Sequence, residues 1–378
     1  MTGYFESQLG NLRKSGNFRT IPSDTSASLM LTDLSSNDYL GLALREDLRD
    51  EFYDTREFRS IPMSSSASRL LAASQDHYAS LENHLKELYD RDILLFNSGY
   101  HANTGLISSL AAGSKTMVVA DRLVHASIID GTTLSRSRFT RFPHNDFNKL
   151  EQIISRYEAE VDRILVAVES IYSMDGDRAD IEALIAIKRR HPKVMLYVDE
   201  AHAFGVEGKN GLGVVNNVDI LHEVDVIVGT FGKAAASMGA FCATTASLRD
   251  YAVNKARSFI FSTALPPVTV AWTEFIVRHI VAMDAERKKL HRLSLQLAEG
   301  LKSICGVDTM ASHIQPFITG DPVEAIRLSQ RLAACGFKVL PIRVPTVPAG
   351  TDRLRISLSA HLSADDISKF LSALEHEI

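Results

Sequence analysis

The sequence is poor in the residues that stabilise small secreted proteins. Its 378 residues include three cysteines, Cys242, Cys305 and Cys335, and their spacing follows no pattern. This usage argues against a disulfide framework and against a cysteine-rich zinc site, and it is typical of a reduced cytosol. We therefore expect a cytoplasmic protein without a structural metal.

Long apolar runs and an excess of one charge are also absent. No uninterrupted apolar run approaches the roughly 18 residues that a membrane span requires, and the polar first thirty residues contain no signal-peptide core. The net charge of −5 predicts no basic surface for nucleic acid or an anionic membrane. We expect neither nucleic acid nor a membrane as a partner.

What is present is a series of short, fully apolar runs of strand length. Strands that are apolar throughout are buried on both faces, which is typical of a mainly parallel α/β sheet. Helices are expected between some of them, at about 147–158 and at 180–190 with Asp180 as N-cap. The predicted strands are 93–96, 116–120, 164–168, 194–198 and 224–228.

The pattern changes after residue 266. A long helical stretch is expected at about 270–304, a second helix from Asp321 to Gly336, strands at 338–342 and 354–358, and a last amphipathic helix. This mixture predicts a second, α+β domain. The expected division is an N-terminal arm (1–40), a large α/β domain (41–270) and a C-terminal domain (271–378).

The stretch Val226–Lys233 is the first candidate for chemistry. It reads Val-Ile-Val-Gly-Thr-Phe-Gly-Lys, a buried strand that ends in a loop with two glycines, a threonine and a lysine. The glycines allow close approach of the backbone, and Lys233 supplies either a charge or a nucleophile. A lysine after glycine is most often a solvated loop residue, so other parts of the chain must support this interpretation.

The second candidate is Asp199, within Asp-Glu-Ala-His at 199–202. It follows a predicted buried strand, at the edge where open α/β sheets bind ligands. One interpretation is a salt bridge, and another is a helicase box whose acid would hold magnesium. A helicase also requires the phosphate loop G-x-x-x-x-G-K-[S/T], which the sequence does not contain.

A protonated heterocycle is the partner that remains for Asp199. Pyridoxal phosphate requires a lysine for covalent attachment, an acid against its pyridine nitrogen, a flat group on its ring, and phosphate donors. Lys233 and Asp199 match the first two needs. His125 follows a strand and matches the third, although a lone histidine is more often structural. The other contacts are assigned to Gly99 and Tyr100 at a helix N-terminus, to Thr230 for the phosphate, and to His202 for the ring hydroxyl.

On these residues the chain resembles the α-oxoamine synthase family of fold-type I pyridoxal-phosphate enzymes. The resemblance implies a mainly parallel central sheet between helices, an N-terminal arm and a smaller C-terminal α+β domain. The matching motifs cover nearly the whole chain, at 35–42, 120–127, 142–146, 173–177, 198–202, 229–233, 314–321 and 345–355.

The resemblance also implies roles for single residues. Lys233 would bind the cofactor aldehyde covalently, Asp199 would hold the pyridine nitrogen protonated, and His125 would stack on the ring. The other cofactor contacts would come from Gly99, Tyr100, Ser173, His202 and Thr230, with Ser262 and Thr263 reaching the phosphate of the neighbouring subunit in a homodimer. Substrate contacts would come from Arg19, Asn37, His125, Thr346 and Arg355.

Within the family, the chain is most similar to members that condense L-alanine with a pimeloyl thioester to make 8-amino-7-oxononanoate in biotin biosynthesis. The thiol carrier would be coenzyme A or an acyl carrier protein. Alternatives are a relative that uses glycine or serine with another acyl-CoA, an aminotransferase, and a non-catalytic protein on the same scaffold. Arg343 is either a ligand for the far carboxylate of the pimeloyl chain or a solvated arginine.

Two loops depart from the family pattern. Family members usually carry several glycines before the first helix of the large domain, where this chain has Ser64, Ser66, Ala67 and Ala73. After the lysine they carry another glycine-rich run, where this chain reads Ala-Ala-Ala-Ser-Met at 234–238. Because alanine tolerates fewer backbone conformations than glycine, the loop shape and the width of the acyl pocket are the least predictable features.

Overall fold

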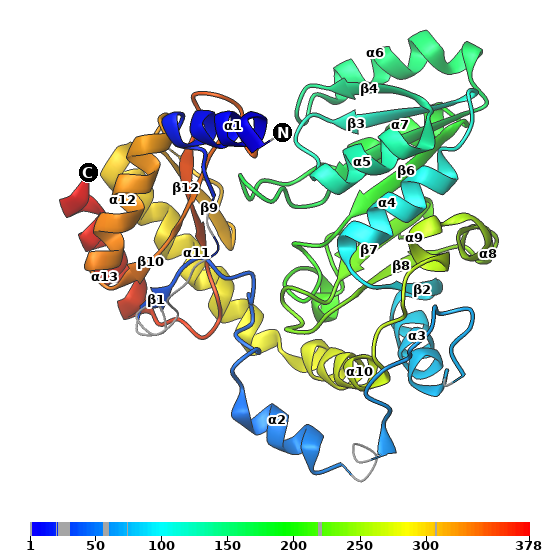
Figure 1. Ribbon diagram of the computed structural model, residues 1–378, viewed down its shortest axis with the longest axis horizontal. Helices are drawn as coiled ribbons and strands as arrows, with labels where there is room; N and C mark the ends of the chain where they lie inside the picture. The colour runs from blue at the N-terminus through cyan, green and yellow to red at the C-terminus, as the bar shows by residue number, and fades with distance from the viewer. Residues whose placement is uncertain are drawn as a thin grey trace. The chain divides into compact units, whose positions relative to one another are not determined.

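The computed structural model describes residues 2–19, 21, 31–55, 60–73, 75–217, 221–306 and 308–378. The chain divides into two compact units (Figure 1). The larger unit holds Leu40–Tyr172 and Arg178–Arg287, and the smaller holds Met1–Tyr39, Ser173–Asp177 and Lys288–Ile378. The residues of the predicted arm thus group with the C-terminal segment, and the main boundary falls after Arg287. The three-part division into domains stays a prediction.

A seven-stranded sheet forms the centre of the larger unit. Its strands are parallel except β8, which runs antiparallel to both of its neighbours. The predicted mainly parallel sheet is therefore confirmed, and each of the five predicted apolar runs contributes a strand. The order across the sheet is β2 (Asp92–Phe96), β8 (Ala240–Thr244), β7 (Val226–Thr230), β6 (Val194–Asp199), β5 (Arg163–Glu169), β3 (Thr116–Asp121) and β4 (Arg138–Phe142).

Two strands of this sheet were not predicted, for different reasons. β4 is an edge strand whose sequence Arg-Phe-Thr-Arg-Phe is mostly exposed, so it lacks an apolar run. β8 is fully buried, but its sequence Ala-Phe-Cys-Ala-Thr is rich in alanine, which has a low strand propensity.

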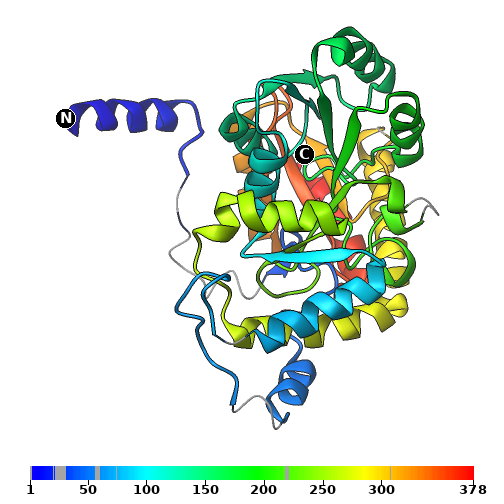
Figure 2. The ribbon, with the colours of Figure 1, turned by 90° about the vertical axis from the view of Figure 1, so that its right-hand side faces the viewer.

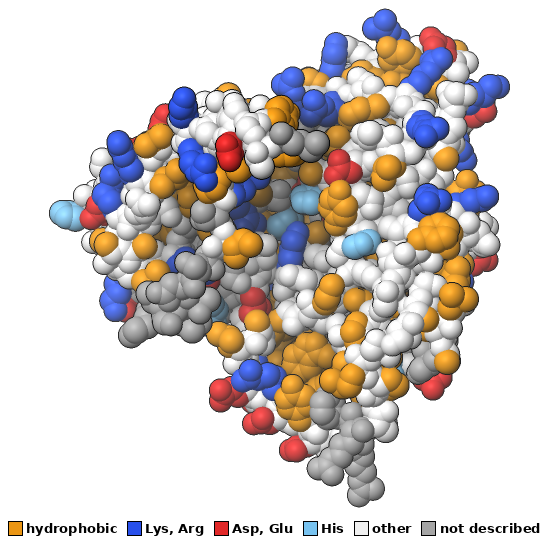
Figure 3. Space-filling view, viewed as in Figure 1, with side chains coloured by type: hydrophobic (Ala, Val, Ile, Leu, Met, Phe, Trp, Pro, Cys, Tyr) orange, Lys and Arg blue, Asp and Glu red, His pale blue; other side chains and the backbone are white. Residues whose placement is uncertain are grey.

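Helices connect and cover these strands. The predicted helices at 147–158 and 180–190 are confirmed, and Asp180 accepts a hydrogen bond from Ala183 N–H as the predicted N-cap. Figure 3 shows positively charged side chains gathered over the part of this unit that contains α6 and β4. The helices are α2 (Glu46–Tyr53), α3 (Asp76–Tyr89), α4 (Gly99–Leu110), α5 (Ala126–Ser135), α6 (Phe147–Tyr157), α7 (Ile181–Arg190), α8 (Ala246–Lys255), α9 (Arg257–Ile260) and α10 (Pro267–Ala282), with short 3-10 turns at 158–160, 209–211, 215–217 and 221–223.

An aromatic cluster packs beside the carboxyl end of β7. The ring centroids of Phe204, Phe231 and Phe241 are 5.1 to 6.0 Å apart, and all three side chains are buried. Gly229 makes room for them, because a Cβ at this position would lie 2.3 Å from the Phe241 ring. This packing supports the loop that follows the strand.

The predicted helix at about 270–304 is wrong in one respect, because it is two helices. α10 ends at Ala282, and α11 (Asp284–Cys305) begins after Met283, whose ψ of 44° is not helical. The buried Arg287 guanidinium donates to the carbonyl groups of Ile280 (2.7 Å) and Val281 (3.2 Å). A side chain thereby satisfies the end of α10, an effect that apolar periodicity does not reveal. α10 packs beside α3 (Figure 2).

The smaller unit is an α+β layer. An antiparallel sheet has the order β11 (Leu340–Ile342), β12 (Arg353–Ser357), β9 (Ile314–Ile318), and β1 (Thr32–Asp33) pairs in parallel with β10 (Phe337–Lys338). The predicted strand 338–342 is therefore split between two sheets. The helices are α1 (Thr2–Lys14), most of α11, α12 (Pro322–Ala334) and α13 (Ala364–Glu377), and the last two confirm the predicted helices. Within the described ranges, no helix is both long and apolar enough to cross a membrane.

Candidate active site

Lys233 lies in a tight loop after strand β7. Thr230 ends the strand, and its hydroxyl accepts from Gly232 N–H (3.3 Å) and donates to the Gly239 carbonyl group (3.1 Å). The Phe231 N–H donates to the same carbonyl group at 2.9 Å. Gly239 has a φ of +112°, which side-chain-bearing residues rarely adopt. The loop therefore closes on itself and holds Lys233 at the carboxyl end of the strand.

Asp199 ends the neighbouring strand β6. It is 5% exposed, and its two oxygens accept from Ala201 N–H (2.9 Å) and from Asn103 Nδ2 (2.7 Å). These donors offset part of the cost of burying a carboxylate. Groups of the protein therefore hold the side chain in one orientation.

A cavity of about 150 Å³ opens at these strand ends in the larger unit. It brings together the predicted lysine, acid, histidines and phosphate donors, which lie up to 134 positions apart in the sequence (233 − 99 = 134). The residues that line it are Gly99, Tyr100, Asn103, His125, Ser127, Glu169, Asp199, Ala201, His202, Thr230 and Lys233.

Lys233 and His202 contact each other in this cavity. Lys233 Nζ lies 2.7 Å from His202 Nε2, and His202 is buried. Because an ammonium group can only donate, Nε2 accepts whenever Lys233 is protonated. The lysine amine is therefore positioned by a buried ring rather than extended into solvent.

His125 is the N-cap of helix α5. Its Nδ1 accepts from Ser127 N–H (3.3 Å) and lies 2.8 Å from Ser127 Oγ. Burial lowers the pKa of His125 below its ordinary value, the positive charge of Lys233 lowers it further, and the carboxylate of Asp199 raises it. We expect a neutral imidazole near neutral pH.

The first turn of α4 supplies a place for an anion. Gly99 and Tyr100 begin this helix, so their N–H groups have no acceptors within it. The side chain of Ser98, the N-cap, accepts from His101 N–H at 3.3 Å. A Cβ added to Gly99 would lie 3.7 Å from Thr230 Cβ, so the Thr230 hydroxyl lies at the same helix end. Free N–H groups at a helix N-terminus favour a phosphate.

Five of the predicted site residues belong to the smaller unit, and three of them are linked by hydrogen bonds. Arg355 is 5% exposed and donates to the Ser173 carbonyl group (2.6 Å), to Ser357 Oγ (2.6 Å) and to the Tyr39 hydroxyl (3.3 Å). The Tyr39 hydroxyl in turn donates to Asn37 Oδ1 at 3.0 Å. The structure therefore joins Arg355, Asn37 and Ser173 in one network, in which Arg355 is buried and Asn37 is half-buried.

Arg19 and Thr346 also meet within the smaller unit. Arg19 Nη2 donates to Thr346 Oγ1 at 3.2 Å. Arg343 donates to the Gly16 carbonyl group, and burial followed by the nearby charge of Arg19 lowers the pKa of Arg343. Two guanidinium groups thus lie within electrostatic reach of each other, with the carboxylate of Asp352 as a nearby counter-charge to Arg343, and the pair could bind an anionic ligand.

The geometry agrees with the comparison with known families. The family model for aminotransferase class I and II matches residues 30–374. The chain belongs to this family. A protein named putative 8-amino-7-oxononanoate synthase from Pasteurella multocida (strain Pm70) is 45% identical over 99% of this chain and 99% of its own length. A protein of the same name from Haemophilus influenzae (strain 86-028NP) is 40% identical over 98% of this chain and 99% of its own.

Solved structures show the same fold. A serine palmitoyltransferase from S. paucimobilis with a bound PLP–myriocin aldimine has a TM-score of 0.89 and 28% identity, over 99% of this chain and 96% of that chain. An 8-amino-7-oxononanoate synthase from Francisella tularensis has a TM-score of 0.77 and 26% identity, over 92% and 97%. The predicted resemblance to α-oxoamine synthases and the fold-type I architecture of this aminotransferase-family chain are confirmed.

The cavity of this aminotransferase-family protein fits a phosphorylated pyridine. Its donor set combines an amine (Lys233), a buried acid (Asp199), a flat ring (His125) and the open end of helix α4. Each of these groups matches one chemical feature of pyridoxal phosphate.

Both loops that depart from the family pattern contain a strained residue. Ala236 has a φ of +44° and Ser66 a φ of +48°, values that glycine adopts without strain. Trp272 Nε1 donates to the Ala236 carbonyl group at 3.3 Å and helps to hold this conformation. One residue in each loop, Ser66 and Ala236, therefore adopts a backbone conformation that glycine would adopt without strain.

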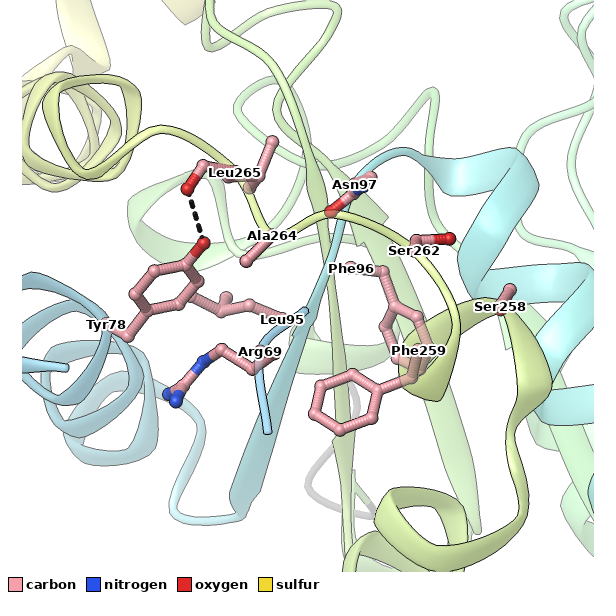
Figure 4. Close-up of a pocket in the computed structure, with 10 residues that line it drawn as sticks. All are labelled: Arg69, Tyr78, Leu95, Phe96, Asn97, Ser258, Phe259, Ser262, Ala264 and Leu265. Atoms are coloured by element: carbon pink, nitrogen blue, oxygen red, sulfur yellow. Dashed lines mark hydrogen bonds between the residues drawn. The ribbon is translucent and has the colours of Figure 1, made fainter. Parts of the chain in front are cut away.

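Ser262 and Thr263 do not line the cavity that contains Lys233, as far as the described part of this single chain shows. Ser262 lines a separate small pocket of about 10 Å³ in the larger unit (Figure 4). The Thr263 carbonyl group accepts from Asn97 Nδ2 at 2.5 Å. Their predicted role toward a neighbouring subunit stays a prediction.

Sequence reasoning missed Asn103, Ser127 and Glu169, which also line the cavity. Ser127 belongs to a motif that carries the resemblance, yet no role was assigned to it. The sequence of α4 also contains a histidine, a threonine and two serines, so nothing in it marked Asn103 as a residue of the cavity.

Proposed function

We propose that this protein is an acyltransferase that condenses L-alanine with a pimeloyl thioester, releases carbon dioxide and the thiol, and forms 8-amino-7-oxononanoate for biotin biosynthesis. The cofactor is pyridoxal phosphate. The observation that carries the proposal is the single cavity in which Lys233, Asp199 and His125 meet at the open end of helix α4. The names of the curated relatives support the choice of substrates.

When bound, pyridoxal phosphate supplies an aldehyde for amines and a protonated pyridine ring that withdraws electrons from the Cα atom of an amino acid. Asp199 would keep the proton on that nitrogen, because a carboxylate in a buried site stabilises a neighbouring positive charge. Asn103 and Ala201 already hold this carboxylate in place.

Lys233 would act as the base that removes the Cα proton of alanine and later returns one. Its contact with His202 Nε2 at 2.7 Å keeps the amine inside the cavity when it is not bound to the cofactor. The helix end at Gly99 and Tyr100, with Thr230, would hold the phosphate and so fix the distance from the ring to Lys233.

The reaction balances without an oxidant or reductant. A carbon–carbon bond forms between alanine Cα and the thioester carbonyl carbon, and the thiolate leaves and takes up a proton. The alanine carboxylate then leaves as carbon dioxide, and a proton from Lys233 takes its place on Cα.

The predicted substrate residues of the smaller unit support the binding of two carboxylates, one of alanine and one at the far end of the pimeloyl chain. Arg355 would bind the carboxylate of alanine. Its three hydrogen bonds to described residues use three of its five N–H donors, which leaves two for the substrate. Asn37 would assist through the Tyr39 hydroxyl. Arg19, Thr346 and Arg343 would bind the far carboxylate of the pimeloyl chain. The positive pair supports this interpretation of Arg343 over a solvated arginine.

The working form would be a cytoplasmic homodimer. Ser262 and Thr263 would then contribute to the phosphate site of the neighbouring subunit.

A second candidate is a relative that uses serine or glycine with another acyl-CoA. This candidate is supported by the higher TM-score to a serine palmitoyltransferase, which is 0.89, compared with 0.77 for the solved 8-amino-7-oxononanoate synthase. An aminotransferase would transfer the amino group without any release of thiol.

Released thiol distinguishes these candidates. Alanine, glycine and serine are each combined with pimeloyl, acetyl and palmitoyl thioesters, carried by coenzyme A or by an acyl carrier protein, with the Lys233→Ala protein as the control. We expect the fastest release from alanine with the pimeloyl thioester. Faster release from serine with palmitoyl-CoA, or none with any pair, would contradict the proposal.

A further inference from the structure

A buried hydrogen-bond chain connects Asp199 to His125. It runs through Asn103 on α4 and Ser127 on α5, to which the sequence motifs assigned no role. Asn103 is 2% exposed and Ser127 is 0% exposed, so both lie away from bulk water. In such an environment each donor and acceptor needs a partner, and the direction of each hydrogen bond is therefore restricted.

The orientation of the Asn103 amide follows from its partners. The carboxylate of Asp199 only accepts, and it lies 2.7 Å from Asn103 Nδ2, so the nitrogen must face the acid. Asn103 Oδ1 then accepts from the Tyr197 hydroxyl at 2.7 Å. Burial, with the nearby charge of Asp199, raises the pKa of Tyr197 well above its ordinary value, so the hydroxyl keeps the proton that it donates.

The second N–H of this amide orients the rest of the chain. Asn103 Nδ2 donates to Ser127 Oγ at 2.9 Å, so the Ser127 proton is available to His125 Nδ1, which lies 2.8 Å from this oxygen. The Ser127 N–H also donates to Nδ1, at 3.3 Å. Because Nδ1 accepts from two donors, it carries no proton, and the neutral imidazole carries its proton on Nε2.

We infer that Asn103 is a positioning residue: one amide orients the Asp199 carboxylate and, through Ser127, holds His125 as a neutral imidazole protonated on Nε2. The value of this state for catalysis rests on the proposed function. An Nε2–H group can donate to an oxygen that gains negative charge, such as the thioester carbonyl oxygen. An imidazolium would instead add a second positive charge beside Lys233.

The charged groups around His125 are consistent with a neutral ring. Asp199 on β6 and Asp130 on α5 favour protonation, whereas Lys233 after β7 opposes it. Burial is the largest influence, and it lowers the pKa of His125.

The test is ¹⁵N NMR of the histidine side chains as a function of pH, in the full-length protein with pyridoxal phosphate bound. Loss of one signal in His125→Gln assigns the resonances. We expect a proton on Nε2 at about pH 7. In Ser127→Ala, which removes one donor to Nδ1, we expect a higher pKa for His125 and a population protonated on Nδ1. Ser109→Ala is the matched control, because this buried hydroxyl donates only to the Leu106 carbonyl group within α4.

Asn103→Ala tests the other half of the inference. It should change the His125 signals in the same direction and also raise the dissociation constant for pyridoxal phosphate about tenfold, since Asp199 loses a charge-assisted hydrogen bond. Ser127→Ala should change that constant by less than about twofold. If Asn103→Ala does not fold, as thermal unfolding would reveal, Ser127→Ala alone decides the outcome for His125.

A proton on Nδ1 in the unmodified protein would overturn the inference, as would unchanged His125 signals in Ser127→Ala. The thiol-release assay separates this result from the proposed function. No thiol release from any substrate pair, together with the expected NMR result, would refute the function and leave the position of the proton intact.

Discussion

Replacing Glu200 by glutamine should change how the stability of this protein depends on pH. Glu200 follows Asp199 at the end of β6 and is 1% exposed. Its Oε1 accepts from Val215 N–H at 3.0 Å, and its Oε2 makes no hydrogen bond of ordinary geometry among the described residues, although the Ser170 hydroxyl and the Val214 N–H lie close enough to lower the pKa of this carboxyl group. Gly213 packs against this oxygen so closely that an added Cβ would lie 1.6 Å from it.

Burial is the main influence on this carboxyl group. It raises the pKa of Glu200 from 4.5 to about 7, with a smaller contribution from the charge of Asp199 and against the opposing hydrogen bonds of the Val215 N–H, the Ser170 hydroxyl and the Val214 N–H. The folded state therefore binds the proton more tightly than the unfolded state does. The stabilisation from this proton is complete below the unfolded pKa of 4.5 and is lost as the pH rises through about 7.

The size of the effect follows from the two pKa values. Between about pH 5 and about pH 8, the linkage relation gives a loss of roughly 2–3 kcal/mol in the free energy of unfolding from this one group. Glutamine has the same shape as the neutral acid and does not titrate. The two proteins should therefore be nearly equally stable at about pH 5, and the variant should be the more stable one at about pH 8.

Urea unfolding of both proteins, saturated with pyridoxal phosphate and followed by tryptophan fluorescence and circular dichroism, measures the difference. The comparison at about pH 5 is the internal control, because residue 200 is then uncharged in both folded states. Parallel stability profiles from pH 5 to pH 8 would refute the reasoning. They would show that Glu200 is ionised in the folded protein and has a partner that compensates its charge.

Three further substitutions, the last with a matched control, test the site and its loop. Lys233→Ala should abolish thiol release and the visible absorbance that covalent attachment of the cofactor produces; normal turnover would exclude the lysine as the essential amine. Asp199→Asn should slow the exchange of the alanine Cα proton into deuterated water on the order of a hundredfold or more while the protein stays folded, and an unchanged rate would show that the acid does not assist this step. Ala236→Gly should raise the free energy of unfolding by about 1 kcal/mol, because it relieves a positive φ, whereas Ala235→Gly, at an ordinary φ, should lower it; thermal unfolding that ranks the two in the opposite order would contradict the strain argument.

The main elements of the larger unit could be predicted because they depend on local patterns. A fully apolar run such as that of β3 or β6 has little alternative to a buried strand, and Asp180 was recognisable as a helix cap from its position alone. The break between α10 and α11 was not predictable in this way. It depends on Arg287, whose guanidinium reaches back to the carbonyl groups of the preceding helix.

The same distinction holds for the candidate site, where some residues could be predicted from local patterns and others depend on contacts that folding makes. Lys233 and Asp199 could be predicted because each ends a strand of a parallel sheet, and such ends meet at one edge. The side-chain partner of Asp199 could not be predicted, because Asn103 lies 96 positions before it in the sequence. Asn103 in turn donates to Ser127, which lies 24 positions after Asn103.

The amino-acid sequence by itself thus determined the family, the sheet and the residue types that chemistry on pyridoxal phosphate needs, since these depend on short motifs and on periodicity. Only the tertiary structure decided which polar groups share a buried hydrogen bond, which residues adopt a glycine-like backbone and which carboxyl group holds its proton. The physical reason is that hydrogen-bond direction, desolvation and strain depend on neighbours brought together by folding, and those neighbours are distant in the chain.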